Sequence, residues 1–273
     1  MNTDAPGRVE PTTGAAASVP PPRAEAGRRG AVRVDEVSKV YASGALHALD
    51  RVSLLAAPGE FVCLLGASGC GKSTLLNLLA GLDEPTAGTI EVDGRTSLMF
   101  QESALFPWLS AVGNIELALR LDGVGREERR IRARELLDLV NLSEFARKRP
   151  HELSGGMRQR VALARALARK ADVLLMDEPF GALDAMTRDL LHDEIERIWR
   201  TEQLTVLFVT HNVREAVRLG DRVVLLSSRP GRVIEEFPVD IARPRRIDST
   251  EVATLAARIT DQLRAEVARH GNH

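Results

Sequence analysis

The sequence predicts an α/β fold built around a phosphate-binding loop. It combines a mostly parallel sheet covered by helices, an antiparallel β edge subdomain and a helical subdomain. From residue 31 onward, short β-type runs alternate with helical patterns, which is typical of such a sheet. Four of these runs are almost continuously apolar, as expected of parallel strands buried on both faces. A glycine-rich segment directly follows the first of the four and opens a helical run.

The strands are placed by the apolar runs and the turn signals between them. The four buried strands are expected at Phe61–Leu65, Val173–Asp177, 205–210 and Arg222–Leu226. Shorter runs at 32–41, 52–55 and 89–92 are accompanied by the turn dipeptides Pro58-Gly59 and Asp93-Gly94. We expect these shorter strands to form the antiparallel edge sheet.

Two segments have the apolar spacing of helices. The first lies between residues 110 and 147, with apolar positions at Ile115, Leu119, Ile131, Leu136, Leu137 and Val140. Because it interrupts the alternation of strands and helices, it predicts a helical subdomain at about 102–160. In the second segment, apolar residues at i, i+4 and i+8 predict an amphipathic helix over 252–267, within a C-terminal extension at 247–273.

Composition completes the outline of the chain. Residues 1–30 are rich in Pro, Ala, Gly and Thr and lack the apolar stretch of a secretory signal, so they predict a disordered leader before a main domain at 31–246. A net charge of -1 argues against a nucleic-acid partner. Two cysteines provide no disulfide or metal framework, which favours a reducing cytosol. No apolar run approaches the roughly 20 residues of a membrane-spanning helix.

The glycine-rich segment fits the Walker A pattern, so the expected core is that of a P-loop NTPase. Its residues are Gly66, Ala67, Ser68, Gly69, Cys70, Gly71, Lys72, Ser73 and Thr74. The glycines let backbone N–H groups point at phosphate oxygens, and the following helix adds the positive end of its dipole. We expect Lys72 to reach the β- and γ-phosphates, Ser73 to coordinate Mg²⁺ and Thr74 to support the α-phosphate. Kinases, GTPases and motor ATPases all fit this motif.

Two adjacent carboxylates end the predicted strand at Val173–Asp177. Neighbouring residues on a strand point in opposite directions, so Asp177 and Glu178 are expected to have different roles. Asp177 would hold the magnesium site beside Ser73. Glu178 would face the γ-phosphate and polarise the attacking water as a general base.

A second candidate anion site precedes that strand. Ser154 is a natural N-cap, and Gly155 and Gly156 leave the start of the following helix bare, with the helix expected to end near Ala168. One nucleotide cannot easily use both helix ends within a single subunit. The simplest arrangement is two subunits, head to tail, with two nucleotides between them.

With these motifs in this order, the chain resembles the nucleotide-binding subunits of ABC transporters from Ala31 to about Arg246. The resemblance implies ATP hydrolysis and further site residues: the adenine-stacking Tyr41, the Q-loop Gln101 beside the γ-phosphate and magnesium, the D-loop Asp184 and the switch histidine His211. The chain departs from the family pattern at Met157, where Gln is usual, and at Gly181, where Ser is usual. Both positions lie outside the groups that touch phosphate most directly.

Three further segments resemble the nitrate, sulfonate and taurine importer branch: 106–109, the signature ending in Met157, and 228–236 followed by Pro244. In that branch the ATPase is a separate chain on the cytoplasmic face of the membrane. The resemblance implies a second ATPase subunit, permease subunits that dock near 106–109, and indirectly a substrate-binding protein. The simplest dimer is one of identical chains.

Other functions stay open at this point. An exporter or lipoprotein-release ATPase also occurs as a separate chain, although 228–236 favours import. A DNA-repair or chromosome-organising ATPase would carry a long coiled coil, and no heptad run is visible. The cargo is not determined by the sequence.

Overall fold

The computed structural model describes residues 29–41, 46–181 and 183–270. All of the predicted leader except Arg29 and Gly30 lies outside these residues. The division of the rest into a main domain, a helical subdomain and a C-terminal extension stays a prediction.

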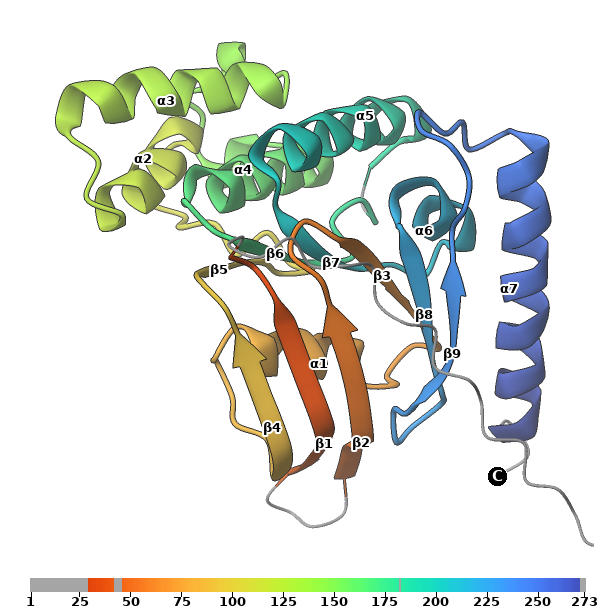
Figure 1. Cartoon of the computed structure of the whole chain (residues 1–273). Coiled ribbons are helices and arrows are strands. Elements are labelled where there is room, and N and C mark those ends of the chain that lie inside the picture. The colour runs from red at the N-terminus through yellow and green to blue at the C-terminus, as the bar shows by residue number, and fades with distance from the viewer. Residues whose placement is uncertain (1–28, 42–45, 182, 271–273) are drawn as a thin grey trace, which may run out of the picture.

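A six-stranded sheet forms the centre of the molecule (Figure 1). In spatial order its strands are β5 (Thr96–Met99), β6 (Val173–Asp177), β7 (Thr205–Val209), β3 (Phe61–Leu65), β8 (Arg222–Leu226) and β9 (Val233–Pro238). The first five are parallel, and β9 pairs antiparallel with β8. The mostly parallel sheet is thereby confirmed, and the four buried strands lie where they were predicted. The two outermost strands, β5 and β9, were not predicted.

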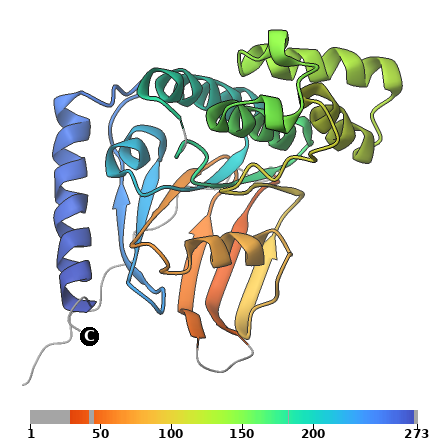
Figure 2. The same ribbon diagram turned by 180° about the vertical axis from the view of Figure 1, so that it is seen from behind.

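A smaller antiparallel sheet packs beside the large one. Its order is β2 (Leu46–Ala56), β1 (Val32–Tyr41) and β4 (Ala87–Val92), which confirms the predicted edge sheet and extends two of its strands. Helix α1 (Lys72–Leu79) lies between the two sheets (Figure 2). Its buried face shares one apolar cluster with Val34 of the small sheet and Leu64 of the large one. This packing fixes the direction in which α1 leaves the glycine-rich loop.

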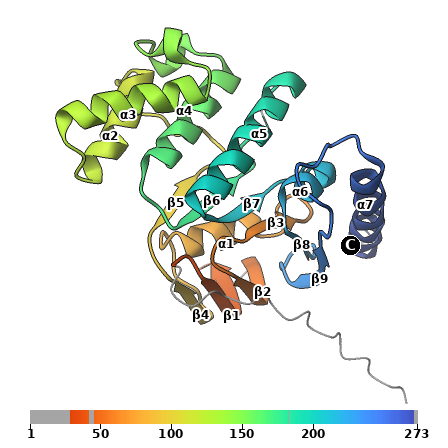
Figure 3. The same ribbon diagram turned by 45° about the horizontal axis from the view of Figure 1, so that its top comes forward.

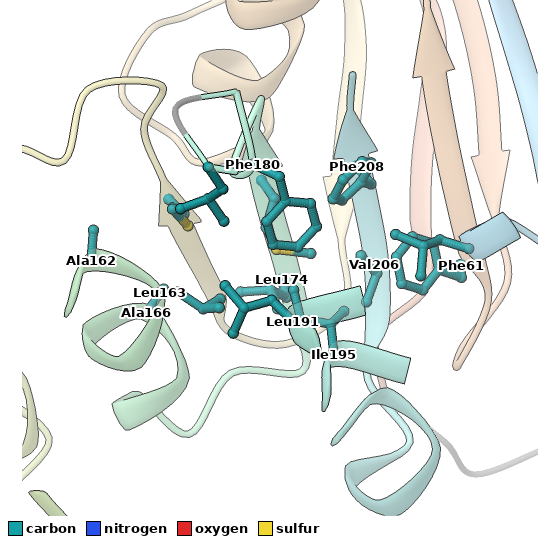
Figure 4. Packing of buried hydrophobic residues seen from close by; sticks show 14 of the residues in the cluster. Phe61, Ala162, Leu163, Ala166, Leu174, Phe180, Leu191, Ile195, Val206 and Phe208 are labelled. Atoms are coloured by element: carbon teal, nitrogen blue, oxygen red, sulfur yellow. The ribbon is translucent and has the colours of Figure 1, made fainter. Parts of the chain in front are cut away.

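The other face of the large sheet is covered by α4 (Gly155–Ala168), α5 (Ala185–Glu202) and α6 (Val213–Leu219). An aromatic row crosses this face, with Phe208 5.8 Å from Phe61 and 5.6 Å from Phe180 between ring centroids (Figure 4). Leu191 and Ile195 of α5 pack in the same apolar cluster. Because Phe180 follows the carboxylate pair closely, this core also anchors the segment that holds the pair.

Helices α2 (Ala111–Leu121) and α3 (Arg126–Leu139) form a lobe to one side of the sheet (Figure 3). The 3-10 turns Ser143–Phe145 and Pro150–Glu152 then lead back to α4. Helix α7 (Thr250–His270) is longer at both ends than the predicted 252–267 and packs on α6 through Val252, Ala256 and Ile259. No helix among the described residues has both the length and the apolar character needed to cross a bilayer.

Arg245 ties the end of α6 to the chain that leads into α7. Its buried guanidinium donates to five carbonyls, those of Val217, Arg218, Gly220, Val239 and Ile241. Burial, reinforced by the neighbouring cation of Arg243, lowers the pKa of Arg245 to about 10.

Replacing Arg245 with Met is expected to lower the free energy of unfolding by about 2–4 kcal/mol, because buried carbonyls lose their donors. Denaturant unfolding would measure the change. Arg246→Gln is the matched control, since that side chain is 81% exposed and pairs only locally with Asp248. A change below about 0.5 kcal/mol for Arg245→Met, the size usual for surface substitutions, would contradict the prediction.

Candidate nucleotide-binding site

The Walker A loop runs from the end of β3 to the start of α1, as predicted, and two of its glycines are required by close packing. Gly71, the residue before α1, has φ of 104°, and a Cβ there would lie 2.6 Å from the carbonyl oxygen of Ala48. A Cβ on Gly66 would lie 2.7 Å from Sγ of Cys70. Neither position accepts a side chain without displacing its neighbours.

Lys72 is folded into this loop. Its side chain is buried, and Nζ donates to the carbonyl oxygens of Gly66 and Ala67, both at 2.9 Å. The ammonium group therefore lies against the backbone predicted to bind phosphate. These carbonyls satisfy a buried cation that would otherwise be costly.

The two carboxylates at the carboxyl end of β6 differ in exposure, with Asp177 buried and Glu178 more accessible. Asp177 is 8% exposed and hydrogen-bonds the side chain of Ser73. Burial raises the pKa of the Asp177 carboxyl, and the Ser73 hydrogen bond partly offsets this; the negative charge of Glu178 raises the pKa further. The site thus holds an acid whose charged form gains from a nearby cation.

The fold brings Glu178 close to His211 and Gln101, two other residues predicted to belong to the site. Its Oε2 lies 3.1 Å from Nδ1 of His211 and 3.5 Å from Nε2 of Gln101. The backbone of Glu178 is left-handed, with φ of 46°, and its N–H donates to the carbonyl of Val209. A non-glycine residue in this region is held there by its surroundings.

The signature segment occupies a separate helix end. Ser154 caps α4 by accepting from the N–H of Met157 at 3.2 Å, and both Gly155 and Gly156 lie in the first turn. Among the described residues, no hydrogen bond or ion pair joins this segment to the Walker A loop. The two helix ends predicted to bind anions therefore make no polar contact with each other among the described residues.

Two further predicted residues, Asp184 and Tyr41, have no hydrogen bond, ion pair or ring contact with the Walker A loop among the described residues. Asp184 caps α5 by accepting from the N–H of Thr187 at 2.9 Å, and this backbone hydrogen bond lowers the pKa of Asp184. Tyr41 ends β1 and is 37% exposed, with Nζ of Lys39 5.2 Å from its ring centroid.

The structure adds residues that the motifs did not identify. Nε2 of Gln159 on α4 donates to the carbonyl of Gln101 at 3.0 Å, so the signature helix holds the Q-loop directly. Arg165, on the same helix, donates to the carbonyls of Ser103 and Ala104. The helical spacing placed both residues on a helix, but nothing in the sequence indicated contacts to a loop about 60 positions earlier.

A strand, a glycine-rich loop with a buried lysine and an acidic pair on a nearby parallel strand together define a P-loop nucleotide hydrolase. Comparison with known proteins narrows this class. Residues 49–181 match the family model described as ABC transporter. The chain is 50% identical over 218 residues to the taurine import ATP-binding protein TauB of Burkholderia pseudomallei, covering 76% of this chain and 84% of that protein. It is 46% identical over 220 residues to the nitrate import ATP-binding protein NrtD of Synechocystis sp., and the match covers 77% of this chain and 83% of that protein.

Solved structures agree with these relatives. A dimeric post-hydrolysis state of the ATP-binding cassette MJ0796, bound to ADP and Pi, is 35% identical with a TM-score of 0.72, and the match covers 77% of this chain and 100% of that one. The chain belongs to the ABC transporter family, as one of its ATP-binding and ATP-hydrolysing subunits. The fold class and the general activity expected from the sequence are thereby confirmed.

Proposed function

We propose that two copies of this chain bind two Mg-ATP molecules between them and use hydrolysis to drive import of a small solute such as taurine, a sulfonate or nitrate. The observation that carries the hydrolytic part is the position of Glu178, with its carboxylate within 3.5 Å of His211 and Gln101 and directly after the buried Asp177. The names of the taurine and nitrate relatives support the import of a small solute.

In this proposal the Walker A loop binds the phosphates. Backbone N–H groups of the loop, from Gly66 through Thr74, surround the phosphate oxygens, and α1 points its positive end at them. Lys72 exchanges its two loop carbonyls for the β- and γ-phosphate oxygens, a charge-assisted contact. Tyr41, partly exposed at the end of β1, stacks on the adenine.

The residues present fit Mg²⁺, which prefers oxygen ligands and is usually held by one or two protein groups together with substrate phosphates. Ser73 and Asp177 already meet through a hydrogen bond, and the amide of Gln101 supplies a third oxygen. No cluster of three His, Cys, Asp or Glu elsewhere among the described residues offers a competing metal site. When bound, the cation neutralises charge on the β- and γ-phosphates.

Glu178 and His211 handle the attacking water. The carboxylate of Glu178 orients the water and accepts its proton. In the free protein the imidazole of His211 donates from Nδ1 to that carboxylate at 3.1 Å. With ATP bound, this N–H turns to the γ-phosphate and stabilises the charge that develops there. Gln101 couples this pair to the metal side of the site.

The second copy completes each site. Because Ser154, Gly155 and Gly156 lie apart from the Walker A loop of their own chain, the N-terminus of α4 is free to bind the γ-phosphate held by a partner. Asp184, at the start of α5, would pass the state of one site to the other. The dimeric cassette structures support this assembly.

The segment that leads into α2, at 106–109, is the proposed contact with a permease, on the cytoplasmic face of the membrane. Trp108 is 67% exposed and packs its ring 5.4 Å from that of Phe106 between centroids. An exposed aromatic pair is a suitable docking edge for a helix of a membrane subunit. A substrate-binding protein would then deliver the solute to the permease from the other side.

Uptake measurements test the direction of transport. The labelled solutes to test are taurine, alkanesulfonates and nitrate. Cells that lack this chain are expected to lose at least about 90% of their uptake of one of them, because a permease without ATP hydrolysis cannot accumulate the solute against its gradient. The wild-type chain should restore uptake and Glu178→Gln should not. Unchanged uptake of all three, with slower efflux of any solute, would favour the exporter alternative.

A further inference from the structure

A buried chain of polar side chains connects α5 to the segment that carries His211. Glu215, on α6, accepts from the hydroxyl of Thr210 through one carboxylate oxygen and meets Nε2 of His192 at 2.7 Å through the other. All three side chains are nearly inaccessible, at 0% to 4% exposure. Since a carboxylate only accepts, Nε2 of His192 is the donor in this contact.

The hydrogen-bonded row His192–Glu215–Thr210 contacts the segment of His211 at one end and the segment of Glu178 at the other. Thr210 directly precedes His211, and its hydroxyl also accepts from the N–H of Asn212 at 3.0 Å. The ring of His192 packs edge-on against Phe180, with 4.9 Å between centroids, and Phe180 lies two residues after Glu178. The imidazole of His192 therefore contacts the segment of the proposed general base directly and reaches the segment of His211 through Glu215.

The same elements enclose a small cavity beside the reacting groups. Its volume is about 20 Å³, and α5 contributes Arg188 to its lining next to Glu178 and His211. Nε of Arg188 and Nδ1 of His192 are buried and make no hydrogen bond to described residues, although Nδ1 lies 3.7 Å from a carboxylate oxygen of Asp189. Helix α5 thus borders this cavity through Arg188, one turn before His192.

Asp184, which caps the start of helix α5, is the residue proposed to pass the state of one site to the other across the dimer. His192 lies about two turns further along this helix. A helix moves as a rigid element over such a length, so a shift at Asp184 displaces the imidazole relative to Glu215.

We propose that His192, through Glu215 and Thr210, is a positioning residue that couples the start of α5 to the orientation of His211. This inference rests on the proposed function. In this proposal His192 does not contact ATP. When α5 is in place, the donor on Nε2 fixes Glu215, Glu215 fixes the Thr210 hydroxyl, and the backbone before His211 is held so that the imidazole points at Glu178.

The test measures kcat and KM for ATP in variants that differ only in the hydrogen bond. His192→Met removes the donor at similar volume, whereas His192→Gln keeps an N–H donor. Thr210→Val and Thr210→Ser form the same pair at the other end of the chain. Asp189→Asn, which changes the exposed carboxylate on the Nδ1 side, is the control. The rate of each variant is divided by the concentration of sites that bind nucleotide, so that unfolded protein does not lower the apparent kcat.

His192→Met and Thr210→Val are expected to lower kcat roughly tenfold with KM within about twofold, because a misplaced catalytic group costs rate rather than binding. His192→Gln, Thr210→Ser and Asp189→Asn are expected to keep kcat within about threefold of wild type. Thr210→Val changes the shape of the side chain very little. If His192→Met does not fold, the kcat of Thr210→Val tests the proposal by itself.

Two results would overturn the coupling. One is a kcat for Thr210→Val equal to that of wild type. The other is an equal loss in His192→Met and His192→Gln, which would indicate a packing role only. Failure of the proposed function looks different, since the wild-type chain would then form no ATP-dependent dimer or would not restore solute uptake, whatever the kcat of these variants.

Discussion

Glu178→Gln is expected to lower kcat for ATP hydrolysis by about 10²–10⁴, because the amide can hold the attacking water but cannot accept its proton. The contacts of the carboxylate with His211 and Gln101 are the structural reason for this assignment. Phosphate release under saturating Mg-ATP measures the effect. Glu127→Gln, on the exposed face of α3 with 81% side-chain exposure, is the control and should retain the wild-type rate.

The same variant is expected to trap the dimer. If hydrolysis separates the two copies, blocking it lets the sandwich accumulate, and light scattering should show twice the monomer mass with Mg-ATP and the monomer mass without it. A strict monomer that still binds ATP would contradict closure of this chain by nucleotide alone and would make the permease a necessary part of the dimer. Residual hydrolysis close to that of wild type would remove Glu178 from the role of base.

Lys72→Ala is expected to weaken ATP binding by at least about 100-fold, because two charge-assisted phosphate contacts are lost. Among the described residues, this ammonium donates to the carbonyls of Gly66 and Ala67 and lies 3.7 Å from Sγ of Cys70. Its removal takes this donor from the buried carbonyl of Gly66, whereas the carbonyl of Ala67 keeps the N–H of Cys70. Titration with a fluorescent ATP analogue measures the loss.

Lys148→Ala serves as the control for the loss of one positive charge. That side chain is 51% exposed and pairs with Glu152 on the surface, so binding should stay within about twofold of wild type. Binding by Lys72→Ala at wild-type strength would mean that the phosphates lie elsewhere than in this loop.

The inner strands of the large sheet were predictable because strands buried on both faces appear in the sequence as continuous apolar runs. Strand β5 has the mixed composition of Thr96 to Met99 and becomes a strand only by pairing with β6. Strand β9 contains Glu235 and Glu236, which its position at the sheet edge permits. Both were missed because a partner strand, rather than local sequence, determines them.

In the candidate site, too, some residues could be predicted from local sequence, whereas others depend on distant partners. Residues within a motif, such as Lys72 and Asp177, were identified because phosphate and metal chemistry demands particular side chains at fixed spacing. Gln159, His192 and Glu215 were missed because their partners lie far away in the sequence or on another helix. A buried polar residue within a charged helix leaves no local signal, since its neighbours resemble those of any exposed position.

The left-handed backbone of Glu178 also affects how tolerant this position is to change. At φ of 46°, a β-branched residue would meet a conformational penalty in addition to losing the carboxylate, whereas Gly, Asn or Asp would meet little. A saturation mutagenesis screen at this codon would therefore rank variants by two separate properties. Valine and isoleucine should reduce the amount of folded protein, while asparagine and glycine should give well-folded but inactive chains.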